Sequence, residues 1–397
     1  MGSPAEAFVY DAIRTPRGRV KREGGTLAGV PSYELFAQLL RAFSDRGVPA
    51  AAVEDVVVGV STTFGEQASD PARVAVMQAG WPDTISAGVV SRMCCSGLDA
   101  LASGAAQVRA GQADLIVAGG MESMSRVPMF SDRPAFATDP ELGATTGFVT
   151  IGVSADLTAA KYGITRSELD AFAVRSHELS LAAPRWESLI PIRIDGEIVL
   201  AADEGARAGT TLESLGALKP LFSDDPLWSR VEERFPGFER PSVGLHTVGT
   251  APQLCDAASA AVIGSARAEA TLGRRPIGRI VSWAHTAVRS PGLDGTVAAA
   301  GKALDRANLG IKDVKVAEFN ESFAVSPLVL IKELGLSDEI VNIRGGAVSV
   351  GHPLGASGGI LLANALELLR RHGGGHGLLV IPGALGVATA VVVESPA

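Results

Sequence analysis

The sequence predicts a duplicated α/β fold with a domain inserted between its two halves. Three observations support this prediction: buried β-branched runs that alternate with helical segments, a segment that recurs late in the chain, and a long irregular stretch in the middle. The chain has 397 residues, of which 47% are hydrophobic and 46 are glycine. Such a composition is typical of a globular protein with a large core and many tight turns.

The first half opens with a strand and a helix. Residues 8–10 have the composition of a strand, and Ser32 is expected to cap a helix that Gly47 ends. The spacing of the apolar residues puts them on one face of that helix. These residues are Leu35, Phe36, Leu39, Leu40 and Phe43.

Two further apolar runs, residues 56–58 and 115–120, have the density of β-branched and small residues expected of buried parallel strands. Between them, Cys94 precedes a run of small residues that predicts a helix over 96–110. We therefore expect a cysteine at the beginning of a buried helix.

The second half repeats this plan. The run Val-Glu-Asp-Val-Val-Val around Asp55 is echoed by Ile-Lys-Asp-Val-Lys-Val around Asp313. Asp55 lies 39 positions before Cys94 (94 − 55), and Asp313 lies 39 positions before His352 (352 − 313). The duplication predicts that each half places one reactive side chain at a strand-to-helix turn.

An irregular stretch over residues 125–245 separates the halves. It contains a helical segment near 166–181 and a segment over 221–241 with prolines and aromatic residues. A structureless loop of this length is uncommon in a compact domain, so we expect a separate domain that contacts a ligand. Its aromatic residues are expected to pack in that domain's core, with an acyl tunnel or a subunit interface as alternatives. They are Trp228, Phe235 and Phe238.

Charge and cysteine content narrow the class of protein. The net charge of −8 argues against nucleic acid as the main partner. Three cysteines, two of them adjacent, do not form a disulfide framework, and reduced thiols in the cytoplasm are expected. No apolar run approaches the length of a membrane-spanning helix.

Cys94 is the strongest candidate nucleophile. Unpaired backbone N–H groups and the helix dipole at a helix N-terminus favour thiolate over thiol. The alternative is a small buried residue, which is how most free cysteines behave. We predict that buried role for Cys95 and Cys255.

His352 and Asn320 are the candidate partners of this nucleophile. His352 lies in a glycine-rich run that fixes its backbone and projects its imidazole, so it can take the cysteine proton. Asn320 and Glu321 follow a predicted buried strand. Asn320 can hold a water or a carbonyl oxygen and Glu321 can orient a neighbour, although helix capping would also explain this pair.

Together these motifs resemble the thiolase family over essentially the whole chain. Asp-Ala-Ile-Arg-Thr-Pro at residues 11–16 and Gly-Gly-Met-Glu-Ser-Met-Ser at 119–125 match that family in order and position. The sequence is similar to degradative 3-ketoacyl-CoA thiolases and acetyl-CoA acetyltransferases, including β-subunits of trifunctional fatty-acid oxidation complexes. The resemblance implies a thiolase fold with five αβαβα layers.

The resemblance also implies domains and partners. The N-terminal half would comprise residues 1–124 and 246–275, the loop or CoA-binding domain 125–245, and the C-terminal half 276–397. CoA, acyl-CoA or 3-ketoacyl-CoA would be substrates in lipid metabolism, with no metal and no permanently bound cofactor. A homodimer or homotetramer is expected, and binding of a hydratase/dehydrogenase subunit stays open.

Site residues follow from the same resemblance. Cys94 matches the cysteine that is acylated, and His352 matches the histidine that activates it. Asn320 matches the asparagine that positions a water in an oxyanion hole. Arg207 would lie near the nucleotide end of CoA, and Ser214 near its adenine or pantetheine.

The chain departs from the family pattern in the last catalytic loop. Where the family has Cys-Ile-Gly-Gly-Gly-x-Gly, this chain has Val-Ile-Pro-Gly-Ala-Leu-Gly from Val380 to Gly386. Val380 replaces a cysteine that transfers protons, and Pro382 replaces a glycine that donates an oxyanion N–H. Loss of a general acid–base typically costs about 10²–10⁴ in rate, and loss of one oxyanion donor about 10²–10³. Ordinary thiolase turnover is therefore expected to be impaired.

Three hypotheses remain open. The first is an acyltransferase that loads Cys94 and uses another acceptor, or condenses decarboxylatively as ketosynthases of the same superfamily do. The second is a non-catalytic partner that binds CoA or a subunit. The third is ordinary thiolysis, with Cys95 or Cys255 in place of the missing cysteine.

Overall fold

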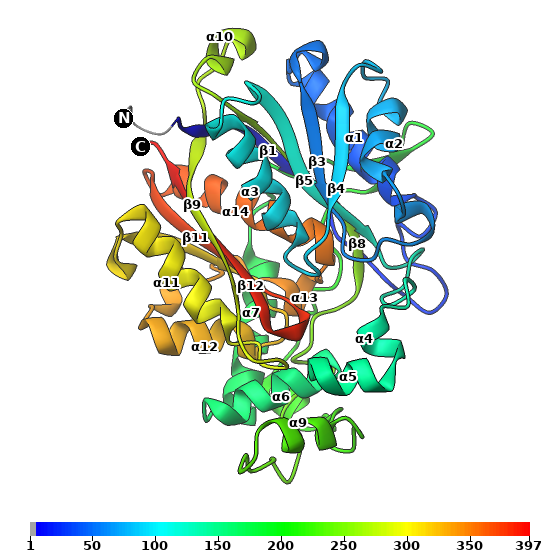
Figure 1. The fold of residues 1–397 in the computed structure, drawn as a ribbon, viewed down its shortest axis with the longest axis vertical. Helices are drawn as coiled ribbons and strands as arrows, with labels where there is room; N and C mark the ends of the chain where they lie inside the picture. Colours follow the sequence, from blue (N-terminus) through cyan, green and yellow to red (C-terminus); the bar gives the residue numbers. More distant parts are fainter. Residues whose placement is uncertain (1–4) are drawn as a thin grey trace.

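A computed structural model of the protein describes residues 5–397 and contains one large mixed sheet (Figure 1). Its strands follow the order β10-β11-β12-β9-β1-β8-β5-β3-β4, and β2 pairs with β8 beside this path. The strands are β1 (Ala7–Arg14), β2 (Gly18–Arg19), β3 (Asp55–Gly59), β4 (Ser86–Val90), β5 (Leu115–Ser123), β8 (Cys255–Gly264), β9 (Gly278–Ala287), β10 (Val314–Phe319), β11 (Gly375–Pro382) and β12 (Val387–Ser395).

The sheet consists of two half-sheets joined by a short contact. Only the beginnings of β1 and β9 pair across the junction, with Val9 opposite Gly278. One half-sheet contains β4, β3, β5, β8 and β1, and the other contains β10, β11, β12 and β9. Parallel pairs stand at the outer side of each half, β3 with β4 and β5, and β10 with β11.

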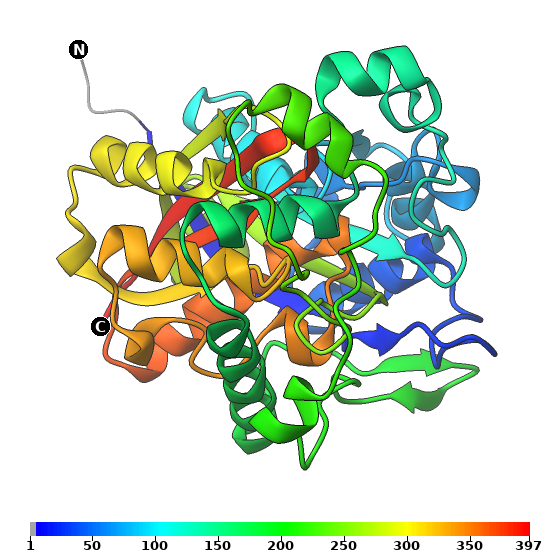
Figure 2. The same ribbon diagram turned by 90° about the horizontal axis from the view of Figure 1, so that it is seen from below.

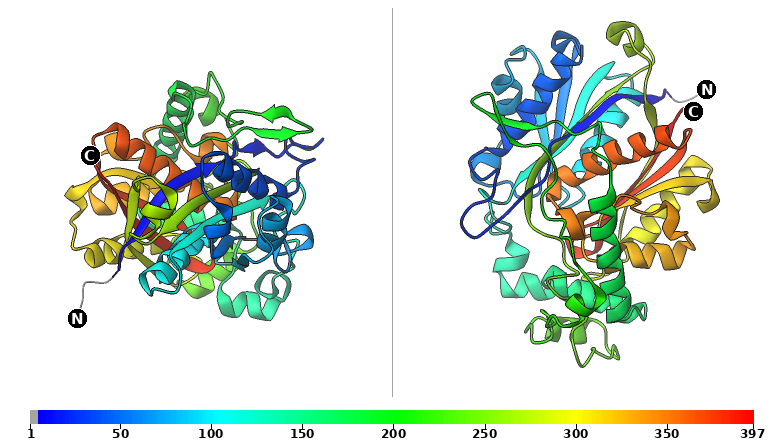
Figure 3. Two further views of the ribbon diagram at one scale, coloured as in Figure 1. Left: turned by 90° about the horizontal axis from the view of Figure 1, so that it is seen from above. Right: turned by 180° about the vertical axis from the view of Figure 1, so that it is seen from behind.

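Six helices complete a five-layer arrangement. Helices α3 and α14 pack on each other between the half-sheets, as the rear view in Figure 3 shows for α14. Helices α1 and α2 cover the outer face of the first half, and α11 and α12 lie outside the second. Their bounds are α1 (Ser32–Asp45), α2 (Pro71–Gln78), α3 (Ser96–Arg109), α11 (Gly295–Ala307), α12 (Val325–Leu334) and α14 (Ser357–Arg371). The predicted fold class is confirmed.

The two halves show the predicted duplication with one difference. In the second half, the strand that would correspond to β4 is reduced to a single bridge between Val341 and Ala317. His352 therefore follows the short helix α13 (Ala347–Val350) and not a strand, which corrects the expectation. The glycines that flank this segment favour tight turns over extended backbone, and Gly345 and Gly351 have positive φ angles.

Most predicted elements of the first half are confirmed. The strand over 115–120 lies in β5, and the small-residue helix is α3. The predicted cap of α1 was wrong by one residue, because Pro31 with ψ 148° precedes the helix and Ser32 is its first residue. Proline with its fixed φ is well suited to a helix beginning. Gly47, with φ +82°, follows the end of α1 as expected.

Most of the irregular middle stretch folds into helices at one end of the molecule, seen from below in Figure 2. Residues 192–200 of the stretch lie instead beside α1, where the Gln38 amide donates to the carbonyl oxygen of Arg193 at 2.8 Å. Thr165 and Glu168 form a capping box that begins its longest helix. The elements are α4 (Ala135–Thr138), α5 (Pro140–Thr146), α6 (Ile151–Lys161), α7 (Arg166–Ala182), β6 (Ile192–Ile194), β7 (Glu197–Leu200), α8 (Leu212–Gly216) and α9 (Trp228–Arg234), while α10 (Ala268–Leu272) connects β8 to β9. Within residues 5–397, no helix has the length and apolar character needed to cross a membrane.

The aromatic residues of this stretch pack together as predicted. Trp228 is 2% exposed and stacks on Phe238, with ring centroids 6.4 Å apart and an interplanar angle of 4°. Phe235 and Val153 belong to the same small apolar cluster between α6 and α9. These side chains therefore form the local core of the middle stretch.

Candidate active site

The beginnings of α3 and α14 lie against each other, and this contact brings Cys94 and His352 together. A Cβ at Gly97 would be 2.5 Å from the carbonyl oxygen of Gly355, and a Cβ at Gly358 would be 2.1 Å from backbone of α3. No larger residue fits at either position without a shift, so glycine permits the close approach. Cys94 lies two residues before the first residue of α3, and His352 lies shortly before α14.

Cys94 and His352 line one cavity of about 200 Å³. Its walls are mostly apolar and come from α6, the segment before β8, the residues after β10 and the end of β11. Phe148, Leu254 and Phe323 are among the lining residues. The thiol and the imidazole therefore share a site with little competing charge.

The turn that carries Cys94 is held by hydrogen bonds. The Ser96 hydroxyl donates to the carbonyl oxygen of Met93 at 2.5 Å and accepts the Arg92 backbone N–H at 2.9 Å. Met93 has φ +50°, which is unusual for a residue with a side chain. A strained turn of this kind is typical of functional sites, where neighbouring contacts fix the geometry.

The surroundings of Cys94 keep it protonated. Burial raises the pKa of the Cys94 thiol well above its usual range, and the nearby Cys95 and Glu122 add to the rise. This direction is opposite to the one that the helix N-terminus favours, so desolvation outweighs the dipole here. Cys94 consequently needs a base to become a nucleophile.

His352 lines the same cavity as Cys94 and is the candidate for that base. Its Nδ1 lies 2.7 Å from the Ser357 hydroxyl, and its Nε2 lies 3.3 Å from the amide nitrogen of Asn320. Because the amide nitrogen only donates, Nε2 is the acceptor and Nδ1 carries the proton. Burial, with a smaller contribution from the charge of Arg17, lowers the pKa of His352 to about 3. The imidazole is therefore neutral near pH 7.

Asn320 and Ser322 follow the end of β10. The Asn320 backbone N–H donates to the carbonyl oxygen of Val380 at 2.9 Å. Its amide nitrogen donates to the Ser322 hydroxyl at 2.6 Å. The side chain is 4% exposed and lies beside His352, so its amide can hold a polar atom next to the imidazole.

Glu321 anchors the segment that precedes His352. Its carboxylate accepts hydrogen bonds from the Ser176 hydroxyl at 2.8 Å, the Val348 backbone N–H at 2.8 Å and the Asn342 amide at 2.9 Å. Burial raises the pKa of this carboxyl, which is fully inaccessible. These bonds fix α13 against α7, and so Glu321 orients the backbone before His352.

Two positioning residues were missed at the level of sequence. Glu122 is fully buried and accepts the backbone N–H groups of Ser61 at 2.8 Å, Thr62 at 3.1 Å and Gly355 at 3.0 Å. Ser357 contacts Nδ1 of the His352 imidazole, as described above. Both residues stand in the quoted motifs, at Gly-Gly-Met-Glu-Ser and Gly-Ala-Ser-Gly, but spacing alone assigns neither a role.

Of the replacements Val380 and Pro382 in the loop 380–386, only one lines the cavity. Pro382 lines the cavity, and proline has no N–H to offer there. Val380 is fully buried and packs in the apolar cluster that contains Phe319 and Ala390. Neither side chain carries an ionisable proton.

The other two cysteines are buried, as predicted. Cys95 is fully inaccessible, and its thiol donates to the carbonyl oxygen of Ile381 at 3.2 Å. Burial raises the pKa of Cys95 to about 12. Cys255 is 1% exposed beside Gly351, and burial raises its pKa as well.

Arg207 and Ser214 lie outside the cavity, and both are exposed. The Arg207 backbone N–H donates to Nδ1 of His177 at 3.0 Å. Burial, followed by the charge of Arg19, lowers the pKa of Arg207. The Ser214 hydroxyl forms a capping box with Thr211 at the beginning of α8.

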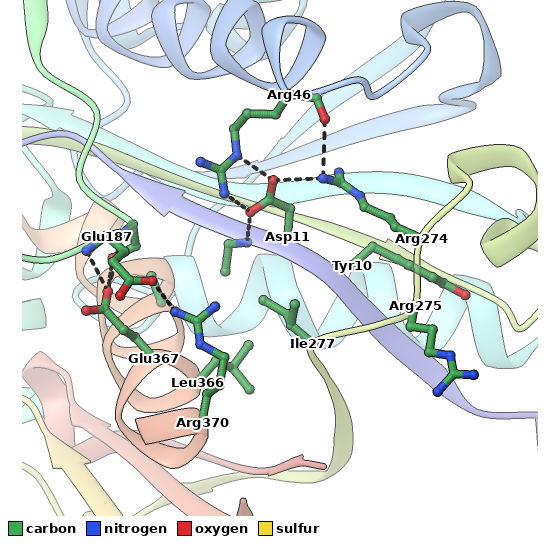
Figure 4. A pocket seen from close by; sticks show the side chains of 13 residues that line it. Tyr10, Asp11, Arg46, Glu187, Arg274, Arg275, Ile277, Leu366, Glu367 and Arg370 are labelled. Carbon is green, nitrogen blue, oxygen red and sulfur yellow. Dashed lines mark hydrogen bonds and ion pairs between the residues drawn. The ribbon is translucent and has the colours of Figure 1, made fainter. Parts of the chain in front are cut away.

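A charged pocket of about 250 Å³ lies beside the C-terminal half of α14 (Figure 4). Asp11 accepts from Arg46 at 2.7 Å and from Arg274 at 3.4 Å, and Arg370 pairs with Glu187. Most charges of this pocket therefore pair with each other, and they come from β1, α14 and the segments near them.

Comparison with known proteins identifies the relatives of this chain. The family descriptions "Thiolase, N-terminal domain" and "Thiolase, C-terminal domain" match residues 7–226 and 274–395. An acetyl-CoA acetyltransferase of Shinella zoogloeoides is 36% identical over 96% of this chain and 97% of its own length. A beta-ketoadipyl-CoA thiolase of Pseudomonas knackmussii is 34% identical over 98% of this chain and 99% of its own. The crystal structure of the Bacillus anthracis acetyl-CoA acetyltransferase matches with a TM-score of 0.84 and 29% identity, over 99% of this chain and 100% of that one.

Proposed function

Because the chain belongs to the thiolase family of acyl-CoA acyltransferases, we propose that Cys94 carries the acyl group and that His352 activates it. One observation supports this proposal above the others. A thiol whose pKa is raised and a neutral imidazole with an unprotonated Nε2 line the same cavity. A thiol and a base are the two groups that exchange the proton in the first acyl transfer.

The first half-reaction balances with this pair alone. The Cys94 sulfur attacks the thioester carbonyl of acyl-CoA while Nε2 of His352 takes the thiol proton. The carbon–sulfur bond to CoA then breaks, and His352 returns the proton to the departing CoA thiolate. Asn320, beside the imidazole, would hold the water or carbonyl oxygen that bears negative charge in the intermediate.

We propose that the phosphates of CoA bind near Arg207 and Arg19. Arg207 is exposed, the positive charge of Arg19 acts on it, and arginine recognises phosphate well. Gln253 lines the cavity, and its amide donates to the carbonyl oxygen of Gly205 at 3.0 Å. This bond connects the Arg207 segment to the cavity wall. Ser214 is the candidate for the adenine or pantetheine end.

The altered loop favours a second step that differs from ordinary thiolysis. Val380 supplies no proton for the substrate carbon, and Pro382 supplies no N–H at the cavity wall. A decarboxylative condensation would suit this site, because loss of CO₂ forms the carbanion without removal of an α-proton. Transfer of the acyl group to another nucleophile is equally compatible with one cysteine and one base.

We also propose a cytoplasmic homo-oligomer that acts in lipid metabolism. Strand β4 is the edge of the first half-sheet, and its residues are partly exposed. An open edge strand is a ready surface for pairing with a second copy. Sedimentation of the purified protein tests this, and a monomer at all concentrations would contradict it.

Release of free CoA tests the acyltransferase proposal. On mixing with an acyl-CoA, we expect a burst of one CoA thiol per chain, because acylation of Cys94 liberates it. Cys94→Ala removes the sulfur and should abolish the burst. Absence of a burst from the native chain with every acyl-CoA donor, while CoA still binds, would favour a non-catalytic partner protein instead.

A further inference from the structure

Two cavities, not one, open onto the sulfur of Cys94. The first contains His352, and the second has a volume of about 290 Å³. Cys94, Met129, Phe130 and Leu354 line both. The thiol therefore stands at the junction of two hollows that extend in different directions.

The CoA arm and the acyl group must occupy different hollows when the thioester reaches Cys94. The first cavity borders Gln253, which is bonded to the Arg207 segment, so the arm of CoA reaches the sulfur from that side. The second cavity is formed by residues after β3, by the turn before α3 and by residues near α4. With the CoA arm in the first cavity, the second cavity remains as the space for the acyl group.

The second cavity is shaped for an apolar group of considerable size. Met129 is 37% exposed and Phe130 is 45% exposed at its wall, so an apolar ligand would remove both from water. Phe136 also lines it, and Phe130 and Phe136 lie 6.0 and 5.0 Å from Phe148. An apolar cavity of about 150 Å³ is enough to hold benzene. This cavity is larger.

The charges of the second cavity do not favour a carboxylate. Arg92 is its one cationic lining residue among those that the structure describes, and its Nε already pairs with Asp99 at 3.0 Å. Asp132, an exposed carboxylate, also lines the cavity. A ligand carboxylate would compete with Asp99 for Arg92 and lie near Asp132, at a desolvation cost.

We propose that the acyl group carried by Cys94 is uncharged and apolar, and larger than acetyl, with a body at least the size of a phenyl ring. This inference rests on the proposed function, because it assigns the substrate class of the same site. It separates this chain from the relatives named for beta-ketoadipyl-CoA, whose name specifies a dicarboxylic acyl group.

A panel of acyl-CoA donors tests the substrate class. Acetyl-CoA, hexanoyl-CoA, phenylacetyl-CoA and adipyl-CoA are compared by the rate of the CoA burst at equal concentrations. Hexanoyl and adipyl groups have the same carbon number and differ in the terminal carboxylate, so they form a matched pair. We expect hexanoyl-CoA and phenylacetyl-CoA to acylate Cys94 at least about tenfold faster than acetyl-CoA or adipyl-CoA, since differences of a few methylenes are worth this much in an apolar pocket.

Two variants assign the effect to the second cavity. Asp132 is exposed and lines the second cavity but not the first, so Asp132→Trp should lower the ratio of the hexanoyl to the acetyl transfer rate about tenfold. Ile151 lines the cavity that contains His352, so Ile151→Trp should slow both donors alike. Circular dichroism and thermal unfolding confirm that each variant is folded.

The failures of the two proposals are distinguishable. If every donor acylates Cys94 but acetyl-CoA or adipyl-CoA is as fast as hexanoyl-CoA, the substrate class is wrong and the acyltransferase function stands. Equal slowing of both donors by Asp132→Trp would also overturn the assignment of the second cavity. If no donor acylates the native chain, the acyltransferase proposal fails and the substrate class falls with it.

Discussion

The N-terminal end of α14 meets a mostly apolar cavity, whereas its C-terminal half borders a pocket lined by charges (Figure 4). At the first end, His352 and Cys94 have no charged partner within hydrogen-bond distance among residues 5–397, and burial is the largest cause of the pKa shift of both. At the second end, the hydrogen bond to Asp11 raises the pKa of Arg46, and Arg370 pairs with Glu187.

This difference in charge pairing indicates that the apolar cavity, and not the charged pocket, is suited to a reaction. A buried group without a partner charge has a perturbed pKa and is free to exchange a proton with a substrate. Charges that already pair with each other are held in place and contribute to stability instead. Arginines in the last turn of α14 also suit the negative end of the helix dipole. The ion pairs of the charged pocket thus hold α14 in position, and this position places His352 at the apolar cavity.

The largest expected effect is at the apolar end. His352→Gln removes the base while keeping a polar side chain, and the rate of Cys94 acylation should fall by about 10²–10⁴. Stopped-flow measurement of CoA release gives this rate. His376→Gln, a substitution on the exposed side of β11, serves as the matched control and should leave the rate unchanged. A native rate in His352→Gln would show that another group takes the proton.

The next effect concerns the cavity wall. Pro382→Gly restores a backbone N–H at a position that lines the cavity, and one oxyanion donor is worth about 10²–10³ in rate. We therefore expect cleavage of a 3-ketoacyl-CoA by CoA to increase by about 10². Ala384→Gly loosens the same loop without adding a donor and should give no such gain. A similar gain in both variants would attribute the effect to loop freedom.

Burial of His352 predicts an acid-dependent loss of stability. The pKa is about 3 in the folded protein and ordinarily 6.5, so the unfolded chain binds the proton first as pH falls. This contribution is present above pH 6.5 and is lost toward pH 3, by about 1.4 kcal/mol per pH unit. Urea unfolding at several pH values measures it. Below pH 6.5, the free energy of unfolding should depend less on pH in His352→Gln than in the native chain.

Comparing the native chain with His352→Gln cancels the contributions of other groups that titrate in the same pH range. Burial lowers the pKa of His177 to about 4, so His177 also makes the folded protein less stable as pH falls. Burial raises the pKa of Glu318 to about 7, so Glu318 makes the folded protein more stable as pH falls. Both remain in the variant. Identical pH profiles for the native chain and His352→Gln would mean that the imidazole is not held neutral.

The smallest effect is expected at the charged end. Asp11→Asn breaks the ion pairs with Arg46 and Arg274, and because Arg46 is 42% exposed the cost should be about 1 kcal/mol in the free energy of unfolding. Acylation of Cys94 should keep its native rate, which separates the two ends of α14. A large loss of acylation without a loss of stability would mean that the charged pocket takes part in the reaction.

The order of elements was largely predictable from sequence, because apolar periodicity and small-residue runs record which faces are buried. The equal spacing before Cys94 and His352 also indicated the duplication. The single bridge at Val341 that replaces a strand before His352 was not predictable. Glycines indicate that the chain turns there, but they do not indicate whether a strand or a short helix lies between the turns. Glu122 and Ser357 act through contacts with residues that only the tertiary structure brings close. The second cavity likewise has no linear signature.

The most direct test of the Cys94 assignment is mass spectrometry of the intact protein after incubation with hexanoyl-CoA, followed by fragmentation of its peptides. We expect one hexanoyl group per chain, located on Cys94 and absent from Cys94→Ala. Fragmentation distinguishes Cys94 from its neighbour Cys95 within one peptide. A hexanoyl group on Cys95 or Cys255, or one that persists in Cys94→Ala, would contradict the assignment of the nucleophile.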